Sequence, residues 1–465
     1  MNPQVTRFEE LEFQGPDRGI DELTGLRILV LGLGTHGGGT DLIQFLHSRG
    51  ALITVSDAAP RSQIADSIEL IEPLVPAERI HTDGHQDHHL NNIDWVVVNP
   101  AIPPLAPFLK KVRESKVRPV TELGLFLSWV SHSNLAAITG TNGKSTVCAL
   151  TRDMLQSSGI PVQLGGNFGG SLLLQLESAP EETRWIVEVS SFQASRLGNE
   201  IPRPPLVALT SFAPDHLDWH GDQDTYFHAK MNLLQGPHQR PSVVIVAEES
   251  PFKPAIEKLS EDTRIISFSP FGSPGKEIDP ETSPALEGTT GQFNRILAQT
   301  LAQKLGATEE ACRQAATQFN GLPHRFEFVA KIDGVTYIND SKATTPDAAL
   351  SALNRIEGPI HWLCGGKDKG ISLKELAHFC AKKEIQVYAF GESAQNILNA
   401  LADSPSCTLH QFTTLEEAFV SARLRSQAGE TLLCSPAYPS FDQYQSFEQR
   451  GEQFRTLVTG TSSTL

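Results

Sequence analysis

The chain has 465 residues, and at roughly 150 residues per domain this length predicts about three domains. Its composition, 39% hydrophobic and 20% charged with 36 Gly and 30 Pro, excludes a disordered chain, a collagen and a coiled coil. The 38 Lys and Arg residues against 54 Asp and Glu residues give a net charge of −16, which argues against a nucleic-acid partner because such binding needs a basic surface.

Residues 1–24 are polar and acidic, and we expect them to form a loosely held N-terminal leader. They have no basic start followed by an apolar segment, so they do not resemble a secretory signal. The longest apolar run, residues 123–130, is shorter than the roughly 18–20 residues that span a bilayer. The six cysteines form no C-x-x-C pair, which is typical of reduced thiols. We therefore expect a cytoplasmic protein with no membrane partner, and we also expect a monomer.

The segment 25–121 alternates short apolar runs with a helical pattern. Each run is apolar and is followed by a glycine, an aspartate or an Asn-Pro pair, which predicts buried strands at 27–31, 52–55 and 94–98. A helix is expected at 42–48, between the first two runs. This alternation is typical of a parallel sheet, and it predicts a Rossmann-like domain.

The segment 122–321 predicts a second α/β domain. Its strands are expected at 135–139, 185–189, 206–209 and 243–246. Its helices are expected at 144–158, 292–305 and 309–319. Residues 269–289 are rich in Gly, Pro and Ser and are expected to form a surface insertion.

The pattern restarts after the turn signal at Asn320–Pro323, which predicts a linker and a third domain, 322–465. A hairpin is expected around Asp333-Gly334, with strands at 326–331 and 335–338. Further strands are expected at 360–364, 387–390 and 431–435, and a last helix at 447–457. The predicted fold class is therefore α/β in all three domains.

A glycine-rich turn follows the first predicted strand. Gly32, Gly34 and Gly37 match the G-x-G-x-x-G pattern, and Asp57 follows Gly37 by about 20 residues, at a strand end. Taken alone, this pattern favours a nicotinamide-dependent oxidoreductase. The helix N-terminal amides could equally hold the diphosphate of another nucleotide, or the turn could bind nothing.

A second glycine loop, GTNGKST at residues 140–146, lies between a predicted strand and a predicted helix. Consecutive amides in such a loop cradle phosphates, Lys144 would neutralise their charge, and Ser145 could ligate Mg²⁺. The standard P-loop has a glycine five positions before Gly143, where this chain has Ile138. The pattern therefore predicts an ATP-binding loop of a shorter kind.

This short loop resembles that of the Mur ligase superfamily, which also includes the folylpolyglutamate synthases. These enzymes join an amino acid to a carboxylate with cleavage of ATP. Further segments similar to the family follow in order at Gly166-Asn167, Glu188–Gln193, Asp215–Asp218, Tyr226–Lys230, Gly321–Glu327, Asn339–Thr344, Gly365–Lys369 and Ser435–Asp442. The resemblance implies a UDP-binding Rossmann-like domain (25–121), a P-loop-type ATPase domain (122–321) and a Rossmann-like domain that binds the amino acid (322–465).

The third-domain segments indicate one branch of the family. The NDSKAT sequence at 339–344, the segment beginning SPA at 435 and the FEQRG sequence at 447–451 are similar to ligases that add D-glutamate to UDP-N-acetylmuramoyl-L-alanine in peptidoglycan precursor synthesis. The resemblance implies that ATP converts the substrate carboxylate into an acyl phosphate, which the amine of D-glutamate attacks. A sister ligase for another amino acid and a nucleotide-binding regulator without catalysis are the alternatives.

The resemblance also implies the roles of individual residues. The catalytic residues would be Lys144, Glu188, His216, Lys230 and Lys342. The ATP site would contain Gly140, Thr141, Asn142, Gly143, Lys144, Ser145, Thr146, Asn294, Arg325 and Asp340. The UDP substrate would contact Gly34, Thr35, His36, Asp57 and Asn167, and D-glutamate would contact Thr344, Lys369, Ser440 and Phe447.

Two Mg²⁺ ions are implied as cofactors beside ATP. Their ligands would be Ser145, Glu188, His216 and Lys230, the last as N-carboxylysine formed with CO₂. An ammonium group would repel Mg²⁺, whereas a carbamate supplies an anionic oxygen. From the sequence alone, Lys230 would instead be a solvated helix lysine.

Several positions depart from the family pattern. They are Ser211, Trp219, Gly291 and the Thr345-Pro346 pair. These departures concern loops and the adenine site, whereas the implied catalytic residues are all present.

A histidine-rich segment in the first domain has spacings that a transition metal could use. It contains His81, His85, His88 and His89. The segment is polar and contains glycine but no cysteine, so we expect a surface loop there rather than a metal site.

Overall fold

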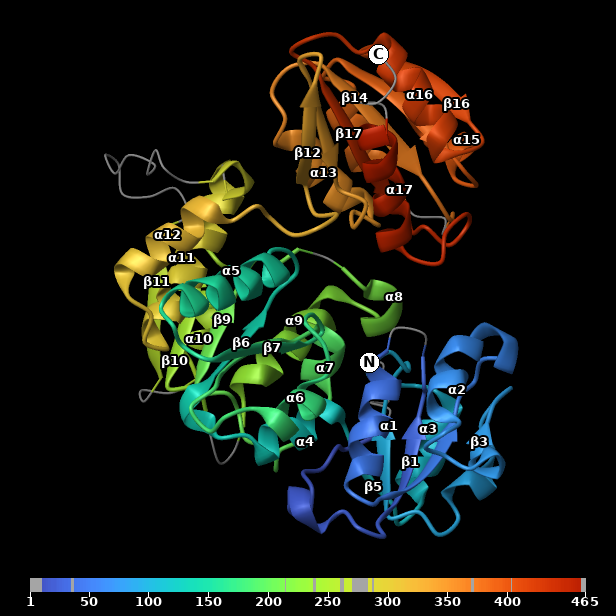
Figure 1. Cartoon of the computed structure of the whole chain (residues 1–465), viewed down its shortest axis with the longest axis vertical. Coiled ribbons are helices and arrows are strands. Elements are labelled where there is room, and N and C mark those ends of the chain that lie inside the picture. Colours follow the sequence, from blue (N-terminus) through green and yellow to red (C-terminus); the bar gives the residue numbers. More distant parts are fainter. Residues whose placement is uncertain are drawn as a thin grey trace, which may run out of the picture. The chain divides into compact units, whose positions relative to one another are not determined.

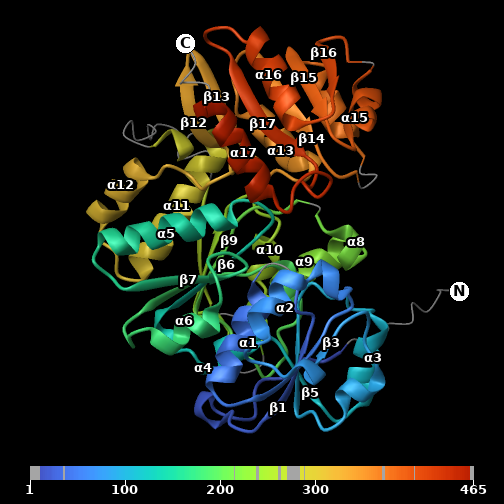
Figure 2. The ribbon, with the colours of Figure 1, turned by 45° about the vertical axis from the view of Figure 1, so that its right-hand side comes forward.

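The computed structural model describes residues 11–34, 37–213, 215–236, 240–259, 263–269, 283–286, 288–368, 372–402 and 404–460. The chain forms two compact units, Met1–Pro280 with Gln292–Thr317, and Glu281–Gly291 with Gln318–Leu465. Figure 1 and Figure 2 show two sheets in the first unit and one in the second, with helices on their faces. The three expected α/β sheets are therefore confirmed.

The first sheet is parallel and has the order β3-β2-β1-β4-β5. Its strands are β1 (Arg27–Leu31), β2 (Leu52–Ser56), β3 (Ile80–His81), β4 (Trp95–Val98) and β5 (Arg118–Val120). Its helices are α1 (Gly38–Ser48), α2 (Ala65–Ile71) and α3 (Pro107–Glu114). The order reverses between β1 and β4, and ligands of open α/β sheets bind at the carboxyl ends of strands at such a point.

The expected loosely held leader is wrong for its described part, residues 11–24. Phe13 and Leu23 are buried, at 7% and 0% exposure. The Gln14 N–H donates to the carbonyl of Pro119 in the edge strand β5 at 2.9 Å, and Trp95 Nε1 donates to Asp17 at 3.0 Å. The segment packs because its apolar side chains, Phe13 and Leu23 among them, leave water, although most of its residues are polar.

The second sheet is also parallel, with the order β11-β10-β9-β6-β8-β7. Its strands are β6 (Leu135–Thr139), β7 (Val162–Gly166), β8 (Arg184–Glu188), β9 (Leu206–Leu209), β10 (Val243–Ala247) and β11 (Arg264–Phe268). The edge strands β7 and β11 were not predicted, since their sequences are less apolar than those of the buried central strands.

The helices of this domain include α5, which directly follows the second glycine loop. They are α4 (Glu122–Trp129), α5 (Lys144–Ser157), α6 (Leu172–Ser178), α7 (Ser191–Ser195), α8 (Leu217–His220), α9 (Gln223–Met231), α10 (Lys253–Ile256), α11 (Gly288–Lys304) and α12 (Glu309–Gln318). Most of the expected surface insertion, 269–289, lies outside the described residues. No helix in the described ranges is long and apolar enough to cross a bilayer.

The third sheet has the order β12-β13-β17-β14-β15-β16. Its strands are β12 (Glu327–Ile332), β13 (Val335–Asn339), β14 (Ile360–Gly365), β15 (Ile385–Phe390), β16 (Cys407–Phe412) and β17 (Thr431–Ala437). Only β12 is antiparallel, because it forms the expected hairpin with β13 around Asp333-Gly334. The helices are α13 (Pro346–Asn354), α14 (Lys374–Cys380), α15 (Ala394–Leu401), α16 (Leu415–Arg425) and α17 (Phe447–Gly460).

Candidate active site

The second glycine loop connects β6 to α5 and requires glycine at two positions. Gly140 has φ +144° and Gly143 has φ +88°, which L side chains rarely adopt. A Cβ at Gly140 would overlap the hydroxyl of Thr210, and one at Gly143 would lie 2.5 Å from Asn294 Oδ1. The structure therefore brings Asn294 of α11 against the loop, where a nucleotide contact was expected.

Polar groups of the loop are held in place by the segment after β9. The N–H of Thr141 donates to the Ser211 carbonyl at 2.7 Å, and the N–H of Asn142 donates to Ser211 Oγ at 2.9 Å. Lys144 Nζ donates to the carbonyls of Gly140 and Thr141 at 3.0 and 2.8 Å. Ser211 was recognised in the sequence only as a departure from the family pattern, and its role needed the structure.

Glu188 is 1% exposed at the carboxyl end of β8, where it joins two other expected site residues. Its carboxylate accepts from Ser145 Oγ at 2.5 Å and from Asn167 Nδ2 at 2.7 Å. The Asn167 N–H also donates to the Glu188 carbonyl at 2.9 Å. A hydroxyl beside a carboxylate at a phosphate loop is a donor set that fits Mg²⁺, which prefers hard oxygen ligands.

Lys230 of α9 reaches the same loop from the other side. It is 1% exposed, its Nζ donates to the Gly140 carbonyl at 2.7 Å, and the ammonium lies 4.3 Å from the ring centroid of Tyr226. Burial and the nearby charge of Lys144 lower the pKa of Lys230 well below its ordinary value, against the opposing effect of Asp215. Burial thus favours the neutral amine, the form that can react with CO₂.

His216 differs from these residues in its exposure. It has φ +52° directly before α8, and its side chain is 48% exposed. Its Nε2 lies 3.5 Å from Asp215 Oδ2, and its ring lies 4.8 Å from that of Phe192. Within the described residues, no group of three or more His, Cys, Asp and Glu side chains is arranged to hold a metal ion. The role of His216 as a metal ligand therefore stays a prediction.

Asp57 in the first domain contacts the first glycine turn. Its Oδ2 accepts from the N–H groups of Leu33 and Gly34 at 2.7 and 3.1 Å, and its Oδ1 accepts from Ala59 N–H at 2.8 Å. Asp57 therefore supports the turn. Thr35 and His36, the other expected contacts, lie outside the described residues.

One histidine of the histidine-rich segment, His89, is buried, whereas His88 is exposed. Ser56 Oγ lies 2.8 Å from His85 Nδ1 and 3.0 Å from His89 Nδ1, and the ring of His89 stacks on that of His81 at 4.1 Å. Burial, together with the neighbouring histidines, lowers the pKa of His89 to about 4. The expected surface position is thus wrong for His89, which is 5% exposed because it packs on Ser56 and His81.

In the second unit, Asp340 follows β13 and is almost fully buried. Its Oδ1 accepts from the Phe326 N–H at 2.9 Å, and its Oδ2 accepts from Ser435 Oγ at 2.7 Å. Burial raises the pKa of Asp340 to about 6, and the charges of Arg355 and Arg325 act in the opposite direction. The structure therefore places Arg325 close enough to Asp340 for the two expected nucleotide contacts to interact.

Three of the four expected D-glutamate contacts are described. Lys342 Nζ lies 3.9 Å from the ring centroid of Phe447. Ser440 is 1% exposed, and its hydroxyl has no hydrogen-bond partner among the described residues. The Thr344 N–H donates to the Lys342 carbonyl at 2.8 Å. Lys369 lies outside the described residues.

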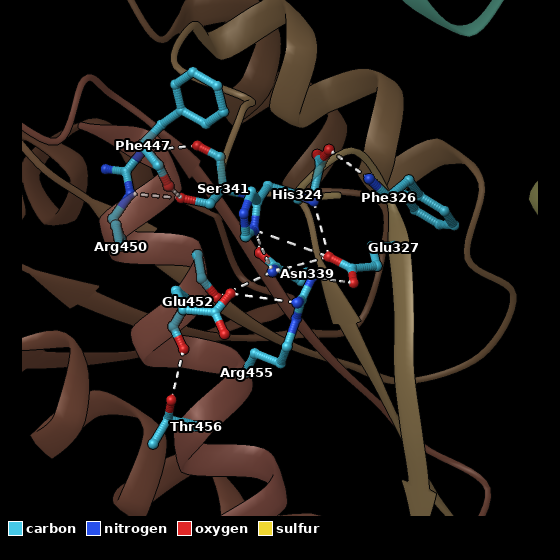
Figure 3. A network of polar contacts seen from close by, with 12 residues as sticks. His324, Phe326, Glu327, Asn339, Ser341, Phe447, Arg450, Glu452, Arg455 and Thr456 are labelled. Atoms are coloured by element: carbon cyan, nitrogen blue, oxygen red, sulfur yellow. Dashed lines mark hydrogen bonds and ion pairs between the residues drawn. The ribbon is translucent and has the colours of Figure 1, made fainter. Parts of the chain in front are cut away.

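A polar network joins the segments that carry these residues (Figure 3). Asn339 Nδ2 lies 2.9 Å from His324 Nδ1 and donates to Glu327 Oε2 at 3.2 Å. Ser341 Oγ donates to the Phe447 carbonyl at 2.8 Å and accepts from Arg450 Nε at 3.0 Å. Among these residues, only Phe447 had been assigned a role. The other residues could have been found from the sequence only because they lie inside the HRFE (324–327), NDSKAT (339–344) and FEQRG (447–451) segments.

Three parts of the chain match domain families. Residues 26–121 match the Mur ligase MurD-like N-terminal domain, residues 138–285 the Mur ligase middle domain, and residues 324–438 the Mur ligase glutamate ligase domain. The match at 26–121 covers the first glycine turn and Asp57, so the nicotinamide interpretation of that turn is not supported.

Full-length relatives carry one name, UDP-N-acetylmuramoylalanine–D-glutamate ligase. The protein of Koribacter versatilis is 31% identical over 94% of this chain and 98% of its own length. The protein of Geobacillus kaustophilus is 34% identical over 93% of this chain and 97% of its own. The protein of Desulfosudis oleivorans is 33% identical over 94% of this chain and 97% of its own length.

Solved structures share the fold at low identity. MurF from Acinetobacter baumannii matches with a TM-score of 0.54 and 18% identity over 76% of this chain and 83% of its own. A pseudomurein peptide ligase type C from Methanothermus fervidus matches with a TM-score of 0.52 and 15% identity, over 94% of this chain and 100% of its own. The bifunctional folylpolyglutamate synthase/dihydrofolate synthase of Yersinia pestis, complexed with AMPPNP and Mn ion, matches with a TM-score of 0.52 and 17% identity, over 71% of this chain and 89% of its own.

Proposed function

The chain belongs to the Mur ligase family, and we propose that it joins D-glutamate to UDP-N-acetylmuramoyl-L-alanine with cleavage of ATP, in peptidoglycan precursor synthesis. The observation that carries this proposal is the convergence of Lys144, Ser145 and Glu188 on one glycine loop, in a chain whose full-length relatives share that name. A sister ligase acting on another amino acid is the alternative that experiment must separate.

The chemistry explains why the site gathers positive charge and hydrogen-bond donors. A carboxylate is a poor electrophile, so the γ-phosphoryl group of ATP is first transferred to it, and the resulting acyl phosphate is attacked by the amine as phosphate leaves. Lys144 would hold the phosphate charge at the loop, and Asn167 would orient the substrate carboxylate. Lys342 would stabilise the negative charge that develops as the bond forms.

Ser145 and Glu188 would hold a first Mg²⁺ ion, and His216 and carbamylated Lys230 a second. When bound, such ions neutralise phosphate charge and orient phosphate oxygens. The buried carboxylate of Glu188 beside the Ser145 hydroxyl supports the first site. The lowered pKa of Lys230 supports its carbamylation, since a neutral amine attacks CO₂ and an ammonium does not.

For the amino acid, we propose contacts with Thr344, Lys369, Ser440 and Phe447. A dianionic amino acid needs a cation and hydroxyl donors. The buried hydroxyl of Ser440, which has no hydrogen-bond partner in the part of the chain that the structure describes, supports this assignment, because a ligand could supply that partner. We also propose domain limits at 25–121, 122–321 and 322–465, together with the UDP contacts expected from the sequence. We further propose that the protein is a monomer located in the cytoplasm.

Phosphate release with a panel of amino acids tests the proposal. Purified protein is given ATP, Mg²⁺ and UDP-N-acetylmuramoyl-L-alanine with D-glutamate, L-alanine, L-lysine or meso-diaminopimelate. We expect turnover with D-glutamate alone, and a hydroxamate when hydroxylamine replaces the amino acid. Turnover only with another amino acid would establish the sister-ligase alternative, and no turnover with any acceptor would favour a regulator.

A further inference from the structure

Arg450, in the first turn of α17, is a completely buried cation that no step of the proposed reaction uses. Its guanidinium donates to Ser341 Oγ at 3.0 Å and to the Ser341 carbonyl at 2.9 Å. It also donates to the carbonyls of Gly365 at 3.2 Å and Tyr438 at 3.0 Å. Burial lowers the pKa of Arg450 to about 10, so the side chain stays protonated at neutral pH. All four acceptors are uncharged oxygens.

These acceptors lie at the carboxyl ends of three neighbouring parallel strands. Ser341 follows β13, Gly365 is the last residue of β14, and Tyr438 follows β17, which pairs with both of the others. Each of the three segments continues into an expected contact of the amino acid. Thr344 follows Ser341, Lys369 follows Gly365, and Ser440 follows Tyr438.

The remaining expected contact, Phe447, is tied to Arg450 through one hydroxyl. Ser341 Oγ accepts from Arg450 Nε and donates to the Phe447 carbonyl at 2.8 Å (Figure 3). The ring of Phe447 in turn lies against the Lys342 ammonium. One guanidinium therefore connects every chain segment that carries a proposed D-glutamate contact.

Gly366 has no side chain at a point where a larger residue would contact the Arg450 guanidinium. Gly366 has φ +143°, and a Cβ there would lie 3.0 Å from Arg450 Nη1 and would overlap the carbonyl oxygen of Pro439. Gly451, the residue after Arg450, leaves room for the ring of His324, whose Nδ1 faces Asn339. The FEQRG sequence thus packs directly against the HRFE and NDSKAT sequences.

We propose that Arg450 is a positioning residue that fixes the D-glutamate contacts relative to one another and adds a buried positive charge beside the dianionic acceptor. The proposal rests on the proposed function, since it concerns the same acceptor. A planar fork with five donors can bridge three carbonyl-bearing segments, whereas the ammonium of a lysine cannot match its geometry. We therefore expect a lysine at this position to keep the positive charge but to lose the bridge between the three segments.

The test compares Arg450→Lys with a matched control, Arg203→Lys. Arg203 is also 0% exposed and donates to several carbonyls, including those of Asn232 and Gln235, both at 2.9 Å, but it lies in the first unit. We expect Arg450→Lys to raise the KM for D-glutamate by about tenfold or more, because charge-assisted hydrogen bonds that order the contacts are lost. The KM for ATP and the hydroxamate formed without amino acid should change by less than about twofold.

Two further outcomes keep the proposal falsifiable. Arg203→Lys should lower the melting temperature without changing the KM for D-glutamate. If Arg450→Lys does not fold, Ser341→Ala, which removes only the shared hydroxyl, should still raise the KM for D-glutamate selectively. The proposal would be overturned if Arg450→Lys changed the KM values for ATP and D-glutamate equally. It would also be overturned if the KM for D-glutamate stayed unchanged in both Arg450→Lys and Ser341→Ala. A wild type active only with another amino acid would overturn the proposed function instead. The positioning role of Arg450 would then be tested by the effect of Arg450→Lys on the KM for that amino acid.

Discussion

The Nζ of Lys230 donates a hydrogen bond to the carbonyl of Gly140 at 2.7 Å, across 90 residues of sequence. This contact joins α9 to the glycine loop between β6 and α5. Lys144, on the same loop, donates to the same carbonyl at 3.0 Å. Two lysines thus share one backbone oxygen, and the energetic cost of placing two positive charges together is relieved when one of them loses its proton.

Lys230 should therefore form a carbamate. Protein equilibrated with ¹³C-labelled CO₂ should show a carbamate carbon signal by NMR, because burial lowers the pKa of Lys230 and so favours the neutral, nucleophilic amine. Lys230→Met should remove that signal, whereas Lys258→Met, at an exposed lysine, should keep it. A spectrum that is the same for the wild type and Lys230→Met would show that this lysine is unmodified.

Glu188→Gln and Ser145→Ala should both weaken the response to Mg²⁺. Each substitution removes an oxygen from the pair that lies 2.5 Å apart, so we expect turnover to fall by about 10²–10³-fold and half-saturation to need more Mg²⁺. Phosphate release measured across a Mg²⁺ titration gives both quantities. Ser157→Ala, at the exposed end of the same helix, is the control and should behave as the wild type. Normal Mg²⁺ dependence in both site variants would remove these residues from the metal site.

Glu122 should make the stability of the first unit depend on pH. Burial raises the pKa of Glu122 from 4.5 to about 7; Ser171 donates a hydrogen bond to it at 2.8 Å, and the charge of Asp41 adds to the rise. The protonated acid is thus favoured in the folded state. Its contribution, about 1–3 kcal/mol, is present below pH 4.5 and is lost as the pH rises towards 7.

Melting temperatures of Glu122→Gln and the wild type between pH 4.5 and 8 check this prediction. The variant should gain stability relative to the wild type as the pH rises, because a neutral amide has no charge to bury. Glu69→Gln, at an exposed carboxylate of α2, should stay parallel to the wild type. Parallel curves for Glu122→Gln as well would show that Glu122 titrates normally.

Gly451→Ala should destabilise the second unit, whereas Gly460→Ala should not. Both glycines lie in α17, but a Cβ at Gly451 would overlap the ring of His324, and one at Gly460 would meet no atom of the described residues within 4 Å. We expect a loss of about 1–3 kcal/mol for Gly451→Ala and a gain of up to about 1 kcal/mol for Gly460→Ala. Thermal unfolding of the two variants provides the measurement, and equal melting temperatures would contradict the predicted overlap.

The central strands and the glycine loop could be predicted closely from the sequence. The run at 135–139 and the run at 206–209 coincide with β6 and β9, since a strand buried on both faces must be apolar throughout. Edge strands such as β7 and β11 escaped prediction because water covers part of them and relaxes that requirement. The packing of Phe13 escaped prediction as well, because the few apolar side chains of residues 11–24 are scattered among polar ones and form no clear pattern.

The sequence by itself determined the α/β class and the order of the motifs, and its glycine loop predicted the roles of Lys144 and Ser145, because these depend on local periodicity and on residue chemistry. The role of Glu188 was predicted from the resemblance of its segment to the Mur ligase family. Only the tertiary structure decided that Ser211 holds the glycine loop, that Asp57 supports its own turn, and that Arg450 bridges three strand ends. The acceptors in these contacts are the Asp57 carboxylate, two serine hydroxyls and several backbone carbonyls. Every residue has a backbone carbonyl, so no sequence pattern can distinguish the one that folding brings within reach of a buried charge.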